Sequence, residues 1–304
     1  MGFAEDGRAG IDAALVGRLI AEQFPQWQQL PIRPVPVHGW DNRSYRLGDE
    51  LTVRLPTHAM YVPAVEKERR WLPVLAPQLP LPIPVPVAVG RPGPGYPFAW
   101  SVRRWLDGAP ATPGRIDDLS RFATALAEFL LALQAIDPAD GPPAGAHCFF
   151  RGASLTQYDE ETRQTLATLA ARPDAGGIDL AGAAATWQAA LAAQWHGRPV
   201  WFHGDVAAGN LLVRDGRLAA VIDFGTCGVG DPACDLVIAW TLLGGPSRQA
   251  FRAAIGQDQA CWARARGWVL WKSLICLAAG LERDSAEDNR RIIAEVIAEH
   301  RAGD

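Results

Sequence analysis

The chain has 304 residues, of which 49% are hydrophobic and 20% are charged, and its formal net charge is -4 at pH 7. This length suffices for one large domain or two smaller ones, and the composition is typical of a globular protein. The acidic balance argues against a nucleic-acid partner, because nucleic acids are bound by basic surfaces. Only two lysines, Lys67 and Lys272, occur, so almost all positive charge is carried by arginine.

Cysteine usage and the N-terminal residues indicate a protein of the cytoplasm without a membrane anchor. The five cysteines form no CxxC pair and have no histidine at zinc-site spacing, which predicts reduced, packed thiols. The stretch "MGFAEDGRAGIDAAL" carries acidic residues where a signal peptide needs a basic region. No uninterrupted apolar segment approaches the length needed to cross a membrane, so we expect no membrane partner.

The first third of the chain reads as strands with two helices. Apolar residues recur at helical spacing over residues 11–24, and residues 64–77 form a second helical stretch that ends in prolines. Between them, residues 33–56 read as three strands separated by turns. Residues 83–90 and 98–106 are extended, and Pro84 and Pro86 predict that the first of these is an edge strand.

The composition changes after the segment "LDGAP", residues 106–110. Alanine- and leucine-rich helices are expected over residues 117–136, 159–171 and 182–195, and again from Leu236 to the end. Two short strands joined at Gly216 form a hairpin that interrupts this series of helices. We therefore predict an α+β fold with two lobes, a strand-rich N-terminal lobe over residues 1–104 and a mostly helical lobe over residues 105–304.

The stretch "VWFHGDVAAGNLLVRDGRLAAVIDFG" places three polar residues at telling intervals: Asp205, then Asn210, then Asp223 in an Asp-Phe-Gly sequence. Phosphoryl transfer needs a carboxylate that orients the attacking hydroxyl, and ligands for Mg²⁺ ions that neutralise phosphate charge. In protein kinases a loop Asp does the first task, and an Asn five residues later and the DFG Asp bind metal. The alternative is that these residues only cap turns.

The segment "HGDVAAGN" resembles the HGDxxxxN loop of the aminoglycoside phosphotransferases and their relatives, which include macrolide phosphotransferases and choline kinases. This resemblance implies a protein-kinase-like fold, Asp205 as the catalytic base, and Asn210 and Asp223 as Mg²⁺ ligands. "DFGTCGVGDPACDL" resembles the family's continuation. From it we expect Asp231 and Asp235 to hold the catalytic loop through its backbone, and His203 to be a packed residue bonded to backbone.

In the N-terminal lobe, "VHGWDNRSYRL" occupies the place of the family's phosphate-covering loop, with Asn42 or Ser44 near the phosphates. An ordinary hairpin turn is the alternative. The resemblance also places residues 104–106 at the hinge that binds the adenine edge through backbone groups, namely Arg104, Trp105 and Leu106.

Two departures from the family pattern matter. The strand "LTVRLP" has Arg54 where the nucleotide-binding lysine is expected, with Glu68 as its ion-pair partner and Glu66 as the fallback. Arginine keeps the charge and can bridge phosphate and carboxylate as a fork. The catalytic loop also lacks a His-Pro pair at Ala207 and Ala208. A rival interpretation is therefore a nucleotide-binding pseudokinase, but the retained Asp205, Asn210 and Asp223 favour catalysis.

We accordingly predict transfer of the terminal phosphate of ATP, or of GTP, to a hydroxyl of a small molecule. No APE-type segment follows, so no protein substrate is expected. An antibiotic-like acceptor is expected, an aminoglycoside ahead of a macrolide or a small amino alcohol. Two acidic clusters, residues 158–161 and 282–288, could contact a polycation, although acidic helix ends commonly face water. Tryptophans of the second lobe fit an apolar acceptor equally well, although the alternative is that most of them belong to the core: Trp187, Trp195, Trp262, Trp268 and Trp271.

Overall fold

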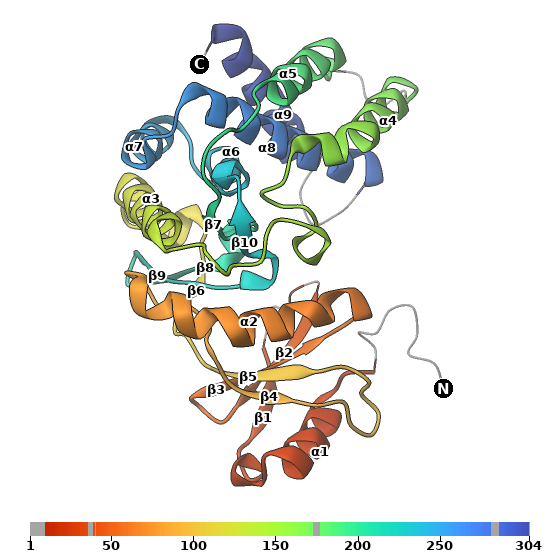
Figure 1. Ribbon diagram of the computed structural model, residues 1–304, viewed down its shortest axis with the longest axis vertical. Helices are drawn as coiled ribbons and strands as arrows, with labels where there is room; N and C mark the ends of the chain where they lie inside the picture. Colours follow the sequence, from red (N-terminus) through yellow and green to blue (C-terminus); the bar gives the residue numbers. More distant parts are fainter. Residues whose placement is uncertain (1–9, 36–38, 40, 173–176, 281–285, 304) are drawn as a thin grey trace. The chain divides into compact units, whose positions relative to one another are not determined.

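The computed structural model describes residues 10–35, 39, 41–172, 177–280 and 286–303. The chain divides into two compact units, drawn in sequence colours in Figure 1. The first comprises Met1–Gly108 and Ala219–Gly225, and the second comprises Ala109–Leu218 and Thr226–Asp304. The first unit is built on an antiparallel sheet and the second is largely helical, which confirms the predicted α+β class.

The sheet of the first unit has five strands in the order β1-β2-β3-β5-β4, and every neighbouring pair is antiparallel. Strand β4 lies at an edge, as its prolines predict. The strands are β1 (Ile32–Pro34), β2 (Asn42–Leu47), β3 (Leu51–Pro56), β4 (Pro86–Gly90) and β5 (Trp100–Arg104).

One face of this sheet is apolar because successive side chains along a strand point to opposite faces. Val53 and Val102 of neighbouring strands belong to a core that includes Leu15 and Leu19 of helix α1 (Ala13–Gln23). Helix α2 (Val62–Leu75) lies on the other side of the sheet (Figure 1) and contacts β4 and β5. Its buried residues include Val65, Glu68, Leu72 and Leu75, which recur at helical spacing.

The second unit gathers its helices around α8 (Gln259–Ala279), which is buried over most of its length and contacts α4, α5 and α9 (Figure 1). Helix α3 packs against α7. The remaining helices are α3 (Leu119–Ala135), α4 (Asp159–Ala170), α5 (Leu180–Ala192), α6 (Ile238–Thr241), α7 (Gly245–Ile255) and α9 (Ala286–Ala302). Within the described ranges, no helix is both long enough and apolar enough to cross a membrane.

Short strands frame the predicted catalytic stretch. Strand β7 (Val200–Phe202) pairs antiparallel with β10 (Gly228–Gly230), and β6 (Ala109–Pro110) pairs with β8 (Leu211–Arg214). Strand β8 continues into β9 (Arg217–Val221) through Asp215 and Gly216, whose φ angles are 51° and 69°. Two successive positive φ angles suit a tight hairpin turn, so the hairpin predicted at Gly216 is confirmed.

Candidate functional site

The loop that follows β7 is fixed at its start by a buried carboxylate. The backbone N–H groups of His203 and Gly204 donate to the two oxygens of Asp235, at 2.8 and 2.7 Å. Asp235 is fully buried in the 3-10 helix Pro232–Val237. Burial raises the pKa of the Asp235 carboxyl, while His203 and the two N–H donors act in the opposite direction. The expectation that Asp235 holds this loop is confirmed.

His203 and Gly204 give the loop its shape. The fully buried His203 accepts a hydrogen bond at Nδ1 from the N–H of Asp205 at 3.2 Å, and its carbonyl accepts one from Thr226 Oγ1 at 3.1 Å. Gly204 has a φ of 85°, and a Cβ there would lie 2.6 Å from the carbonyl oxygen of Thr226. His203 is thus a packed residue bonded to the backbone, as expected, and position 204 requires glycine.

The five-residue interval between Asp205 and Asn210 forms a local contact. A 3-10 turn, Ala208–Asn210, brings Asn210 back, so that its Nδ2 donates to the carbonyl oxygen of Asp205 at 2.9 Å and to Oδ2 at 2.8 Å. These bonds use the amide nitrogen and not the amide oxygen. An amide oxygen is an acceptor and a ligand for hard cations, so the orientation suits metal binding.

Asp231 has a different role from the one expected. Its carboxylate accepts hydrogen bonds from Arg264 of α8, from Nε at 2.6 Å and from Nη2 at 3.1 Å. It also caps the following 3-10 helix by accepting from the N–H of Ala233 at 3.1 Å. The expectation that Asp231 holds the catalytic loop is therefore wrong, because its oxygens join the Asp235-bearing turn to α8.

In the first unit, Arg54 stands between two carboxylates. Its Nη2 donates to Asp223 Oδ1, and its Nη1 lies 3.6 Å from Glu68 Oε1. The fallback partner Glu66 is exposed and bonds Arg69 instead, at 2.6 Å. Burial by itself would lower the pKa of the Arg54 guanidinium, but the charges of Asp223 and Glu68 outweigh it and raise the pKa above its usual value. Arg54 is therefore a permanent cation.

Asn42 and Ser44 also lie near Arg54. In the amide orientation that allows hydrogen bonding, Asn42 Oδ1 accepts from Arg54 Nη2 at 3.0 Å and from Arg54 Nε at 3.1 Å. Ser44 faces Arg54 in the register of β2 and β3. Residues 37, 38 and 40 of the predicted phosphate-covering loop lie outside the described residues, and phosphate contacts of Asn42 and Ser44 stay a prediction.

Asp223 has the backbone conformation of a strained residue. It follows β9 and has a φ of 67°, in the left-handed region that Asp tolerates better than most residues. Such strain is concentrated at functional sites. Asp223 belongs to the first unit, whereas Asp205 and Asn210 belong to the second, so joint action of the three stays a prediction.

Sequence reasoning missed Arg103, which binds Glu68 more closely than Arg54 does. Arg103 Nη2 donates to Glu68 Oε2, and Nη1 donates to Oε1 at 3.3 Å. Its Nε donates to Ser101 Oγ at 3.0 Å, and the residue is buried. The two-residue alternation of "WSVRRW" is the signal that could have found it, because Trp100 and Val102 point into the apolar core.

The residues predicted as the hinge lie at the end of β5. The N–H of Trp105 donates to the carbonyl oxygen of Glu50 at 2.7 Å, and the guanidinium of Arg46 lies 4.0 Å from the centre of the Trp105 ring. The adenine contact predicted for Arg104, Trp105 and Leu106 stays a prediction. It cannot use this N–H while Glu50 accepts from it.

The acidic cluster at residues 158–161 is bonded within the helical unit. Glu161 accepts from Trp271 Nε1 at 2.7 Å, and Asp159 accepts from Trp187 Nε1 at 2.8 Å. Both tryptophans are buried. These bonds favour a structural role for both carboxylates. In the second cluster, Glu282 and Asp284 lie outside the described residues.

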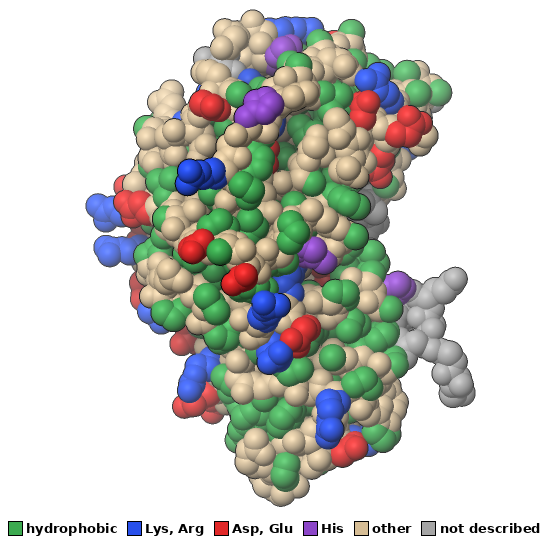
Figure 2. Space-filling model, viewed as in Figure 1, with side chains coloured by type: hydrophobic (Ala, Val, Ile, Leu, Met, Phe, Trp, Pro, Cys, Tyr) green, Lys and Arg blue, Asp and Glu red, His purple; other side chains and the backbone are tan. Residues whose placement is uncertain are grey.

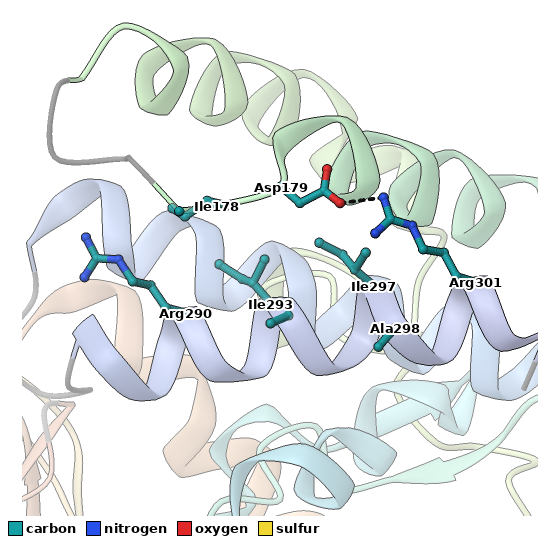
Figure 3. A pocket seen from close by; sticks show the side chains of 9 residues that line it. Ile178, Asp179, Arg290, Ile293, Ile297, Ala298 and Arg301 are labelled. Carbon is teal, nitrogen blue, oxygen red and sulfur yellow. Dashed lines mark hydrogen bonds and ion pairs between the residues drawn. The ribbon is translucent and has the colours of Figure 1, made fainter.

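A hollow of about 150 Å³ lies beside α9, between Arg290 and Arg301 (Figure 3). Ile293 and Ile297 form its floor, and Asp179 pairs with Arg301 at 2.5 Å. Pockets for drug-sized ligands measure roughly 300–1,000 Å³, so this hollow suits neither a nucleotide nor a large acceptor. On the face seen in Figure 2, acidic and basic side chains are interspersed over the described surface.

Comparisons with known proteins agree with this geometry. The sequence profile of the phosphotransferase enzyme family matches residues 31–268. A solved GDP complex of aminoglycoside 2'-phosphotransferase-IIIa is 18% identical with a TM-score of 0.70, covering 95% of this chain and all of that one. The GDP and kanamycin complex of APH(2")-IIia is 20% identical with a TM-score of 0.68, and the match covers 95% of this chain and 99% of that one.

A third similar structure is the macrolide 2'-phosphotransferase MphH from Brachybacterium faecium. It is 24% identical, with a TM-score of 0.58, and 94% of this chain and 97% of that chain are covered. No curated protein sequence matches the chain. These likenesses confirm the predicted protein-kinase-like fold. Since the family profile spans most of the chain, this protein belongs to the phosphotransferase enzyme family and is a phosphotransferase.

Proposed function

We propose that the protein transfers the terminal phosphate of a nucleoside triphosphate to a hydroxyl group of a small molecule in a Mg²⁺-dependent reaction. The observation that carries this proposal is the contact of Asn210 Nδ2 with Asp205 Oδ2 at 2.8 Å, on a loop anchored by buried Asp235. A positioned carboxylate next to an amide ligand is what phosphoryl transfer requires.

Asp205 would act as the base. Its side chain is exposed, so a hydroxyl can approach, and Asn210 fixes the orientation of the carboxylate through Oδ2. Because the N–H of Asp205 bonds His203, the backbone at this position is fixed as well. Asp205 would accept the proton of the attacking hydroxyl, and Arg54 would bind phosphate oxygens.

The proposed ligands are of the chemical type that suits Mg²⁺, which prefers oxygen ligands and is commonly held by one or two carboxylates together with substrate phosphates. Asn210 supplies an amide oxygen and Asp223 a carboxylate that is 26% exposed. When bound, the ion would neutralise charge on the phosphates. ATP is the proposed donor, with GTP as the alternative, and similar structures contain ATP or GDP.

The proposed acceptor is a hydroxylated, antibiotic-like molecule. Similar structures include complexes with kanamycin and gentamicin and a macrolide phosphotransferase. Aminoglycosides are polycations, but Asp159 and Glu161, which could have contacted one, bond tryptophans. Aminoglycosides, macrolides and small amino alcohols therefore form the panel of acceptors to test first.

The test is turnover of ATP and GTP against this panel, with phosphorylated product identified by mass spectrometry. Asp205→Asn should lower kcat by ~10²- to 10⁴-fold, the range for general-base contributions, while Mg²⁺–nucleotide affinity measured by calorimetry stays near that of the wild type. Near-normal turnover in this variant would remove Asp205 from the mechanism. A wild-type protein that binds no Mg²⁺–nucleotide would contradict the proposal as a whole.

A further inference from the structure

Two arginines of the first unit share the single buried carboxylate of Glu68, but they share it unequally. Arg103 donates to both oxygens, from Nη2 to Oε2 and from Nη1 to Oε1 at 3.3 Å. Arg54 Nη1 lies 3.6 Å from Oε1, beyond ordinary hydrogen-bond length, while its Nη2 donates to Asp223. Glu68 is thus held mainly by Arg103, and Arg54 is directed to a different acid.

The register of the sheet explains why both arginines reach one carboxylate. Arg54 faces Ser101 across β3 and β5, and Arg103 lies two residues beyond Ser101 on the same strand. Residues two apart on a strand share a face, so Arg54 and Arg103 are diagonal neighbours on the side that α2 contacts. Glu68 occupies a buried position of α2 and meets both.

We propose that Arg103 is a positioning residue that holds and neutralises Glu68, so that Arg54 is left to bind anionic groups. In this structure the anionic group is Asp223. In the reaction it is the phosphate of the nucleotide, a step that rests on the proposed function. Glu68 thus has a partner other than the arginine in the lysine position.

Because Glu68 and Arg103 are both buried, each needs the other as its ion-pair partner. The side chain of Glu68 is 2% exposed and that of Arg103 is 5% exposed, so each charge needs a partner inside the protein. Without Arg103, the guanidinium that Glu68 still has within reach among the described residues is that of Arg54. Pairing fully with Glu68 would draw Arg54 away from Asp223 and from phosphate. Nucleotide affinity should therefore fall when Arg103 is removed, although Arg103 has no assigned contact with nucleotide.

A double-mutant cycle tests this prediction, with Mg²⁺–ADP titrated by calorimetry. Arg103→Met should raise the Kd for Mg²⁺–ADP by ~10- to 100-fold, the equivalent of one charged hydrogen bond. Adding Glu68→Gln removes the charge that captures Arg54, so the double variant should recover to within ~3-fold of the wild type. If Arg54 instead needs Glu68 as its partner, the double variant will bind at least as weakly as Arg103→Met. That result would overturn the proposal.

Thermal unfolding of the same variants gives a readout that does not depend on nucleotide. The double variant should unfold at a higher temperature than Arg103→Met, because it leaves no buried charge on Glu68. Arg33→Met is the matched control: Arg33 of β1 pairs with Asp49 in the turn after β2 at 2.8 Å, but the two side chains are 59% and 88% exposed. It should change neither Kd nor the unfolding temperature appreciably.

The outcomes separate this inference from the proposed function. A folded Arg103→Met protein with wild-type Kd overturns the role of Arg103. If that variant does not fold, Arg103→Gln, which also removes the positive charge, replaces it with and without Glu68→Gln, and the same recovery is expected. If the wild type binds no Mg²⁺–ADP, the proposed function fails, whereas the pairing of Arg103 with Glu68 is still decided by the unfolding temperatures.

Discussion

Replacing Asp235 by Asn should loosen the loop that carries Asp205. Both carboxylate oxygens of Asp235 accept backbone N–H bonds, from His203 at 2.8 Å and from Gly204 at 2.7 Å, in a fully buried place. An Asn side chain has one oxygen, so one N–H would face an NH₂ group and lose its acceptor. Leaving a buried donor unsatisfied costs about 1–3 kcal/mol, and more where the lost partner is charged. We expect the free energy of unfolding to fall by ~2–4 kcal/mol.

Turnover should fall as well, because Asp205 lies two residues beyond His203 in the chain. A misplacement of about 1 Å at a reacting group can cost ~10²-fold in rate, so we expect a decrease in kcat of that order with little change in nucleotide Kd. Urea unfolding followed by tryptophan fluorescence measures the stability, and steady-state kinetics measures kcat.

Asp118→Asn is the matched control for Asp235→Asn. Asp118 also accepts two backbone N–H bonds, from Ser120 and Arg121 at 2.9 Å each, but it is an exposed N-cap of α3. Asn caps helices about as well as Asp, so this control should leave stability and kcat nearly unchanged. If Asp235→Asn behaves like Asp118→Asn in both assays, the buried carboxylate does not hold the loop.

Three further predictions follow from the ion pairs. Asp223→Ala should abolish Mg²⁺-dependent nucleotide binding, and unchanged affinity in calorimetry would contradict a ligand role. Arg54→Ala should weaken nucleotide binding severely, whereas Arg54→Lys should keep part of it; a wild-type Kd in Arg54→Ala would show that another group binds phosphate. Burial by itself would raise the pKa of Glu295, but the hydrogen bonds from Arg248 and Arg291 outweigh it and lower the pKa below its usual value. Its contribution to stability is therefore present above the unfolded pKa of about 4.3 and is lost as pH falls below it, so Glu295→Gln should flatten the acid limb of unfolding curves.

The conformation of the loop that carries Asp205 and Asn210 could be predicted from the sequence because its determinants are local. Asn210 reaches Asp205 through a single 3-10 turn, and the Asp215-Gly216 pair forms the hairpin that follows. Residue type and short spacing therefore carry most of the information. The role of Asp235 came from the family resemblance, and the structure supplies the two hydrogen bonds behind it.

Contacts between distant segments could not be predicted in the same way. Asp231 and Asp235 are four residues apart in one short motif, yet one binds Arg264, 33 residues further on, and the other binds the loop backbone. Glu161 is likewise engaged by Trp271, 110 residues away. An acidic residue in a sequence shows that a partner is needed, but the packing of helices decides which partner it finds.

The arginine in the lysine position and the arginine that sequence reasoning missed are parts of one electrostatic arrangement. Arg54, Arg103, Glu68 and Asp223 carry two positive and two negative charges, and the first three side chains are at most 14% exposed. A guanidinium spreads its donors over a rigid fork, so Arg54 can approach Glu68 and bind Asp223 at once. In the proposed role of Arg54, phosphate would compete for it only if Glu68 remained neutralised, and Arg103 bonds Glu68 through two groups of its own. We therefore propose that arginine can replace the usual lysine in nucleotide binding because β5 supplies the second cation, Arg103.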